Sequence, residues 1–167
     1  MREQIIRFIR ENEKLIDQED WKTLYAKAKA RDSLSTSTGE LTEVLIAAGL
    51  NPLEKLEEVP ALYLCESTQI SEIDIPEGIK SIAGLGLYNA RHLTRISIPK
   101  SCTYFGILSF AYCNAALYAA TSLVIEYAGT RKEWDLIDKH PQCRLPKLYI
   151  LKCSDIETTE RTNYYEI

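Results

Sequence analysis

The sequence has few histidines, the side chain that most often acts as a general acid or base in enzymes. It contains only two histidines, His92 and His140, so a Ser-His-acid or Cys-His arrangement would need one of them. We expect His92 in a turn and His140, which precedes Pro141, in a polar loop. The chain also lacks the G-x-x-x-x-G-K-[ST] phosphate loop and a complete dinucleotide-binding glycine pattern. We therefore expect no enzyme activity, no catalytic residue and no cofactor.

Metal-binding cysteine spacing is also missing, because no two cysteines form a C-x-x-C pair. The five cysteines are Cys65, Cys102, Cys113, Cys143 and Cys153. A zinc site needs four ligands at recognisable spacing, and the only local candidate is His140-x-x-Cys143 with Cys153. We therefore expect core thiols and no bound metal.

Basic residues are not in excess, because 20 Lys and Arg stand against 24 Asp and Glu, for a formal net charge of −4. Proteins that bind nucleic acids or anionic membranes need a surplus of Lys and Arg to neutralise phosphates. Neither is therefore an expected partner.

Long apolar runs are absent as well. No stretch approaches the about 18 apolar residues of a membrane-spanning helix. Arg7, Arg10 and Glu11 interrupt the first apolar segment, so a signal peptide is not expected either. The sequence therefore indicates a cytoplasmic protein.

The N-terminal part of the chain has helical periodicity and carries the net acidity. Up to Gln69 there are 9 basic and 13 acidic residues. Apolar residues at helical spacing predict three helices. The first contains Ile5, Ile6, Phe8, Ile9, Leu15 and Ile16; the second Trp21, Leu24, Tyr25 and Ala28; the third Leu41, Val44, Leu45 and Ala48. The third should begin near Ser37 or Thr38 and end at Gly49, and a short fourth helix should run from Pro52 to Pro60.

Short helices of this kind also occur in helix-turn-helix DNA-binding domains. A recognition helix presents Arg, Lys, Asn or Gln to bases and phosphates. The third predicted helix instead has Glu40 and Glu43 and no basic residue. DNA binding is therefore not expected.

After residue 69 the sequence repeats itself every 23 residues. The stretch Ile70–Ile82 aligns with Leu93–Phe105, so that Ile73-x-Ile75-Pro76 matches Ile96-x-Ile98-Pro99. The register continues where AGLGLYNA (83–90) aligns with GILSFAYC (106–113). A fixed period of this length indicates a repeat architecture.

Each repeat has the pattern of one coil of a solenoid. Ile-x-Ile is a short strand whose alternate side chains enter a core, and the proline after it ends the strand. Further apolar residues, such as Ile79 with Ile82 and Cys102 with Phe105, point inward from other sides of the coil. One coil cannot bury these residues alone, so stacked coils with parallel strands are expected.

These residues resemble the BspA-type leucine-rich repeat, whose pattern is roughly L-x-x-I-x-I-P-x-x-V-x-x-I-G-x-x-A-F-x-x-C. The best match is the coil that starts at Leu93: Leu93, Ile96, Ile98, Pro99, Cys102, Phe105, Gly106, Phe110 and Cys113. That coil has Ser109 where alanine is usual and Cys102 where valine or isoleucine is usual. The coil that starts at Ile70 has Ala90 in place of the final cysteine, so the resemblance implies that this cysteine only packs.

Two later segments extend the resemblance, which covers about residues 60 to 156. Residues 123–137 are similar to the strand and Y-x-G-T-x-x-E-W-x-x-I element that ends such arrays, with Trp134 as a core anchor. Residues 148–155 are similar to the closing strand, with Ile156 where glycine is usual. Ile98 and Ile125 are 27 residues apart, which indicates about four inserted residues around Asn114 to Ala120.

The sequence therefore predicts an α+β fold with three parts. Residues 1–60 form a helical N-terminal cap, residues 61–156 a short right-handed leucine-rich-repeat solenoid of three to four coils, and residues 157–167 a C-terminal tail. The stretch 41–67 is similar to helical leaders of small bacteriophage repeat proteins. The resemblance therefore implies a bacterial or phage protein in the cytoplasm of a bacterium or an infected host.

The function expected of such a solenoid is to bind another protein, because outward strand residues can vary without disturbing the core. The candidate binding residues are Glu72, Asp74, Arg95, Ser97, Val124, Glu126 and Tyr149. The competing surface is the cap, with Trp21, Tyr25 and the acidic residues between Glu40 and Glu58. Two other roles stay open: a phage inhibitor of a host defence enzyme, and a structural or adhesion protein. The sequence does not indicate an oligomeric state.

Overall fold

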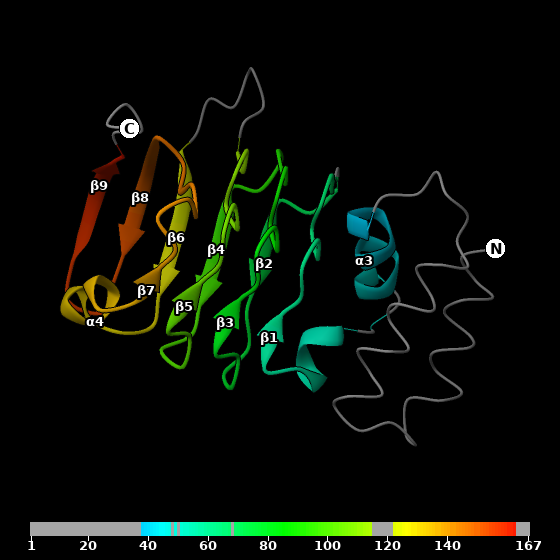
Figure 1. The fold of residues 1–167 in the computed structure, drawn as a ribbon, viewed down its shortest axis with the longest axis horizontal. Coiled ribbons are helices and arrows are strands. Elements are labelled where there is room, and N and C mark those ends of the chain that lie inside the picture. Colours follow the sequence, from blue (N-terminus) through cyan, green and yellow to red (C-terminus); the bar gives the residue numbers. More distant parts are fainter. Residues whose placement is uncertain (1–37, 48, 50, 68, 115–121, 163–167) are drawn as a thin grey trace.

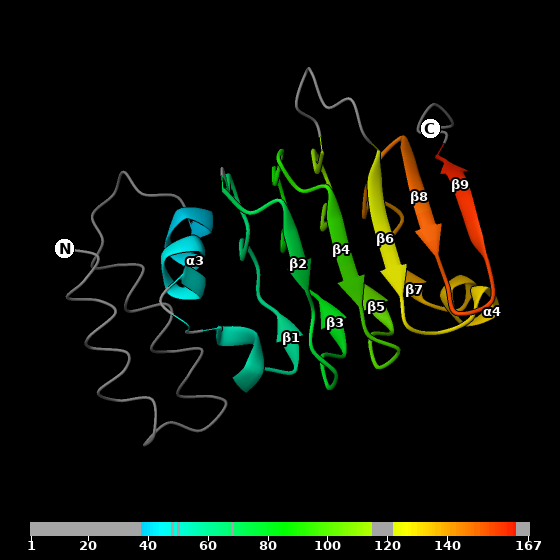
Figure 2. The ribbon, with the colours of Figure 1, turned by 180° about the vertical axis from the view of Figure 1, so that it is seen from behind.

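Two stacks of strands form two sides of a coiled chain, as Figures 1 and 2 show from opposite directions. The computed structural model describes residues 38–47, 49, 51–67, 69–114 and 122–162. One sheet has four short parallel strands: β1 (Glu58–Val59), β3 (Ser81–Ile82), β5 (Tyr104–Phe105) and β7 (Asp138–Lys139). The other has five: β2 (Glu72–Asp74), β4 (Arg95–Ile98), β6 (Leu123–Tyr127), β8 (Leu148–Lys152) and β9 (Glu157–Arg161).

The 23-residue repeat determines how the coils stack. Residue 73 pairs with residue 96 across β2 and β4, and residue 82 pairs with residue 105 across β3 and β5. All neighbours in the larger sheet are parallel except β8 and β9, which are antiparallel. This confirms the β-solenoid with parallel strands that the repeat predicts.

The third side of each coil is a run of tight turns with an unusual backbone. Leu62, Leu85 and Leu108 have φ values of 62°, 62° and 53° and lie 23 residues apart. A positive φ is costly for a bulky side chain. Hydrogen bonds between coils stabilise this backbone conformation. The Leu62 amide donates to the Leu85 carbonyl at 3.1 Å, and the Leu85 amide donates to the Ile107 carbonyl at 2.9 Å.

Equivalent positions of successive coils form columns of the core. One column contains Val59, Ile82 and Phe105, and another contains Leu64, Leu87 and Phe110, all of them buried. Cys102 and Cys113 are also buried, and removal from water raises the pKa of the Cys102 thiol to about 11 and that of Cys113 to about 12. Both side chains therefore remain protonated core thiols near neutral pH.

Ser109, which replaces the usual alanine, is fully buried, and its hydroxyl has no hydrogen-bond partner. A buried polar group without a partner costs about 1–3 kcal/mol. We expect Ser109→Ala to raise the free energy of unfolding by about 1 kcal/mol in urea denaturation. The matched control is Ser101→Ala, because the Ser101 hydroxyl accepts from the Gly78 amide and donates to the Ile79 carbonyl. The control should lower stability, and a destabilised Ser109→Ala variant would contradict the prediction.

The solenoid begins earlier than the repeat alone indicates. Strand β1 pairs in parallel with β3, so residues 58 and 59 already belong to the first coil. Leu56-x-x-Val59-x-x-Leu62-x-Leu64 has the spacing of Ile79-x-x-Ile82-x-x-Leu85-x-Leu87 one repeat later. The fourth predicted helix is accordingly short: a 3₁₀ helix η2 covers Pro52–Lys55, with the Asn51 side chain capping its start.

Helix α3 (Thr38–Ala47) confirms the third predicted helix, and Gly49 follows it with φ of 76°. It lies against the first coil, where the Gly39 amide donates to the Cys65 carbonyl and the Thr42 hydroxyl donates to the Tyr63 carbonyl. The first two predicted helices, with Trp21 and Tyr25, lie outside the described residues. The helical cap over residues 1–60 is therefore not supported beyond α3 and η2.

Helix α4 (Arg131–Asp135) follows β6 and places Trp134 in the core. Thr130 and Glu133 form a capping box at its start. Hydrogen bonds from Lys100 and from Thr130 lower the pKa of Glu133 to about 2. The Y-x-G-T-x-x-E-W element is therefore a capped helix that attaches its tryptophan to the preceding coil.

Two boundaries differ from those expected. Ile125 pairs with Ile96, not with Ile98, so six residues are inserted where four were predicted; residues 115–121 of this region lie outside the described part. Residues 157–161, predicted as part of a tail, form β9 and pair with β8.

Within the described residues, no helix is long and apolar enough to cross a membrane.

Candidate functional site

The outer face of the five-stranded sheet carries two rows of side chains, one at each outward position of the strands. We call these two rows the strand face. The first row is Glu72, Arg95, Val124, Ile150 and Thr159, and the second is Asp74, Ser97, Glu126, Lys152 and Glu157. The residues between the rows, such as Ile73, Ile96 and Ile125, point into the core. Strand alternation therefore separates the strand face from the residues that stabilise the fold.

Arg95 is the centre of an ion-pair network on this face. Its Nε lies 3.0 Å from Glu72 Oε2, its Nη2 lies 2.8 Å from Asp74 Oδ1, and its Nη1 lies 3.0 Å from Glu126 Oε2. These hydrogen bonds, to Glu72 first, raise the pKa of the guanidinium above its usual range. Three strands are thereby linked through one side chain that remains charged.

Lys152 continues the network toward the C-terminal end of the sheet. Its Nζ lies 4.0 Å from Glu126 Oε1 and 3.6 Å from Glu157 Oε2. Val124 and Ile150 pair directly in the first row, and both are half-buried. The strand face therefore has an apolar centre beside a line of alternating charges.

Strands β2 and β4, and likewise β3 and β5, pair in parallel with partners 23 residues apart. This agrees with the repeat read from the sequence. The chain contains a β-solenoid with a 23-residue repeat.

A solved structure to which the chain is similar is that of a leucine-rich cell surface protein from Faecalibacterium prausnitzii A2-165. The two are 33% identical with a TM-score of 0.43, over 50% of this chain and 21% of that one. The matched half of this chain thus corresponds to about a fifth of the length of that protein. No protein-family model matches the chain. No curated protein matches it either.

Six of the seven predicted binding residues lie on the strand face of the solenoid, and Tyr149 does not. Tyr149 is only 4% exposed and points into the core. It pairs with the buried Leu123, whereas Ile150 pairs with the outward Val124. The prediction was wrong by one residue, and in a strand a shift of one residue reverses the face.

Sequence reasoning missed four residues of the strand face: Ile150, Lys152, Glu157 and Thr159. The first two were missed because Tyr149, Ile150 and Leu151 are all apolar, so the sequence does not show which of them face the core. Glu157 and Thr159 were missed because E-T-T-E-R lacks apolar residues. A strand that adds to the edge of a sheet without filling the core leaves no hydrophobic periodicity.

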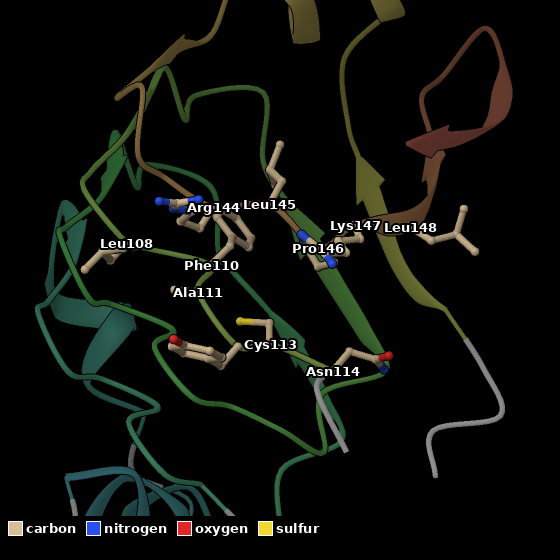
Figure 3. Close-up of a pocket in the computed structure, with 11 residues that line it drawn as sticks. Leu108, Phe110, Ala111, Cys113, Asn114, Arg144, Leu145, Pro146, Lys147 and Leu148 are labelled. Carbon is tan, nitrogen blue, oxygen red and sulfur yellow. The ribbon is translucent and has the colours of Figure 1, made fainter. Parts of the chain in front are cut away.

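A groove of about 700 Å³ lies on the turn side of the solenoid, between residues 108–114 and 144–148 (Figure 3). Its walls include Phe110, Cys113 and Leu145. At its margin Tyr112 is 62% exposed, and its ring meets that of Tyr88 edge-on at 5.6 Å. This groove is a second surface with the aromatic character that protein interfaces favour.

The zinc candidate and the histidines do not form a site in the described part of the chain. Groups of three or more His, Cys, Asp or Glu able to hold a metal are absent among the described residues. The His140 side chain accepts a hydrogen bond from the Gln142 amide and thereby shapes its own turn. Its role in the structure is local.

Proposed function

We propose that the solenoid is a non-catalytic module that binds another protein through the strand face. The observation that carries this proposal is the separation of the two sets of strand residues. In β2, β4, β6 and β8 alternate residues fill the core, and the outward residues of all five strands form one continuous surface. Such a surface can be adapted to a partner without loss of the fold.

The chemistry of the strand face indicates the kind of partner. Val124 and Ile150 supply an apolar centre, and charged side chains surround it, as in the core and rim of protein interfaces. Four carboxylates (Glu72, Asp74, Glu126 and Glu157) stand against Arg95 and Lys152. The face is therefore acidic, and it suits a partner with an apolar patch and a basic margin.

The test compares two triple variants of the full chain. The strand-face variant carries Glu72→Lys, Glu126→Lys and Ile150→Ser. The turn-side variant carries Tyr88→Ser, Tyr112→Ser and Ile107→Ser. Because interface centres commonly contribute about 2 kcal/mol or more, the first variant should weaken binding by about 30-fold or more. The partner is isolated from source cells with the tagged full chain, and its affinity for each variant is then measured by calorimetry.

Stability provides the control for both variants. Exposed substitutions usually change the free energy of unfolding by about 0.5 kcal/mol or less each, whereas those at the half-buried Ile150 and Tyr88 can cost more. Binding is therefore measured for each variant at a temperature at which it is folded. Normal binding by the strand-face variant, combined with loss of binding in the turn-side variant, would move the site to the groove. Normal binding by both would place the site in neither surface.

The finer proposals from the sequence concern domain division, origin and location. We propose that a helical part, the solenoid and a short tail divide the chain near residues 60 and 156, with β1 and β9 extending the solenoid slightly beyond both limits. We also propose a cytoplasmic protein of a bacterium or phage. Inhibition of a host enzyme would rest on the acidic residues before Gln69. Fractionation of source cells tests the cytoplasmic location, and host-enzyme assays test the inhibition.

A further inference from the structure

Strand β9 is the outermost strand of the five-stranded sheet, and among the described residues it pairs with β8 alone. Figures 1 and 2 show it as the last strand of the solenoid, at the end opposite α3. An edge strand of five residues presents backbone donors and acceptors on its outer side, which is the template for pairing with another strand. The question is which strand would fit it.

The hydrogen bonds to β8 determine which residues of β9 present those groups. The Cys153 amide donates to the Ile156 carbonyl at 2.8 Å, and the Thr162 amide donates to the Lys147 carbonyl at 3.1 Å. In an antiparallel pair, bonded and non-bonded positions alternate. Residues 156, 158, 160 and 162 therefore bond to β8. The backbone N–H and C=O groups of Glu157, Thr159 and Arg161 point away from the sheet.

A second copy of β9 can lie antiparallel beside the first, in a register with two-fold symmetry. If Thr159 lies opposite Thr159 of the second copy, Glu157 lies opposite Arg161 and Arg161 opposite Glu157. All three outward residues then form bonded pairs. A register shifted by two residues leaves one of them without an opposite strand residue, so the centred register satisfies the most backbone groups.

The side chains favour the same register. Glu157, Thr159 and Arg161 are exposed on one face of the strand. Arg161 forms no ion pair or hydrogen bond through its side chain with any other described residue, and Glu157 has only the 3.6 Å contact with Lys152. Opposite charges at directly opposed positions stabilise a strand pair, whereas like charges destabilise it. Charged residues usually prevent edge strands from pairing, but here they are complementary under the two-fold rotation.

We propose that two copies of this chain associate through antiparallel pairing of β9 with β9, centred on Thr159, which joins the two five-stranded sheets into one. The interface is isologous and closed, because each strand contributes the same residues to both halves. It uses the backbone edge of β9, although Glu157 and Thr159 also belong to the strand face. The strand-face variant changes Glu72, Glu126 and Ile150 and leaves β9 unchanged, so the two proposals are tested at different residues. A monomer that binds a partner protein would overturn this inference and leave the proposed function intact.

The test is sedimentation equilibrium of the full chain from about 1 µM to about 1 mM. The mass should rise with concentration from 19.0 kDa toward twice that value. Arg161→Glu and Glu157→Arg each place like charges opposite one another twice, and each should weaken the dimer by about tenfold or more. The double variant Glu157→Arg, Arg161→Glu restores opposite charges and should recover the dimer to within about threefold of the original affinity.

Two further variants separate pairing from folding. Thr159→Pro removes an outward amide that β8 does not use, so it should abolish the dimer without unfolding the chain. Glu77→Arg, an exposed charge reversal in the turn after β2, should leave the dimer unchanged. A monomer throughout the concentration range would overturn the proposal. It would also be overturned if the dimer tolerated Thr159→Pro, or if the double variant were no stronger than the single ones.

Discussion

Replacing Trp134 with alanine is expected to lower the free energy of unfolding by about 3–5 kcal/mol, the usual cost of removing a buried large aromatic side chain. Trp134 is 3% exposed. Its ring lies 5.6 Å from that of Phe105 and 5.5 Å from that of Tyr127. It therefore connects α4 both to the preceding coil and to the strand that leads into the helix.

A cation adds to this packing on one face of the indole. Lys139 Nζ lies 5.0 Å from the ring centroid and donates to the Trp134 carbonyl at 2.6 Å. Burial lowers the pKa of this ammonium group, so its contact with the ring and the carbonyl offsets a desolvation cost. Loss of the indole would leave a cavity and a half-buried cation whose remaining aromatic contact is the Phe105 ring, with its centroid 5.9 Å from Nζ.

The measurement is equilibrium denaturation of the full chain in urea, followed by far-ultraviolet circular dichroism. Leu136→Ala is the matched control, because Leu136 is two residues away in the chain and 75% exposed. It should change stability by about 0.5 kcal/mol or less. Equal effects of the two substitutions would show that Trp134 does not anchor this end of the solenoid.

The second large effect is expected at Gly106, where alanine should cost about 3 kcal/mol. A Cβ at this position would lie 2.4 Å from Gly84 N and 2.9 Å from Gly84 Cα, which are backbone atoms of the neighbouring coil. The Gly106 amide also donates to the Ile82 carbonyl at 2.8 Å. The two coils would have to separate to admit the methyl group, and this hydrogen bond would lengthen.

Gly84→Ala is the control for this prediction, because it introduces the same methyl group at the same contact. There the nearest atom is Cγ2 of Ile107, at 3.0 Å, which belongs to a side chain that can move. We expect a cost of no more than about 1 kcal/mol in the same urea experiment. Tolerance of alanine at Gly106 would mean that the spacing between coils is not set by backbone contact.

A local signal was sufficient to predict the strands of the repeat. Ile73-x-Ile75-Pro76 and Ile96-x-Ile98-Pro99 each contain the alternation that forms a strand and the proline that ends it. Their 23-residue separation requires that equivalent residues stack, so the pairing of Ile73 with Ile96 follows from the sequence. The capping box at Thr130 and the buried Trp134 are likewise encoded within one short segment.

The first coil shows what happens when that signal weakens. Leu56 and Val59 keep the spacing of Ile79 and Ile82, but the coil lacks its own Ile-x-Ile-Pro strand. Its β1 strand exists because β3 offers it a partner. The contacts of α3 with the Tyr63 and Cys65 carbonyls fix the other side of the coil, and none of them leaves a pattern in the sequence.

The sequence alone therefore determined the repeat, the stacking of its two regular coils and the core positions within them, because these follow from period and alternation. Only the tertiary structure decided the face of β8 and the pairing of β9. Tyr149 and Ile150 are both apolar, so the sequence permits either to be buried, and pairing with Leu123 and Val124 makes the choice. Strand β9 has no apolar alternation, and its place is determined by hydrogen bonds to β8, which depend on the backbone rather than on the identity of the side chains.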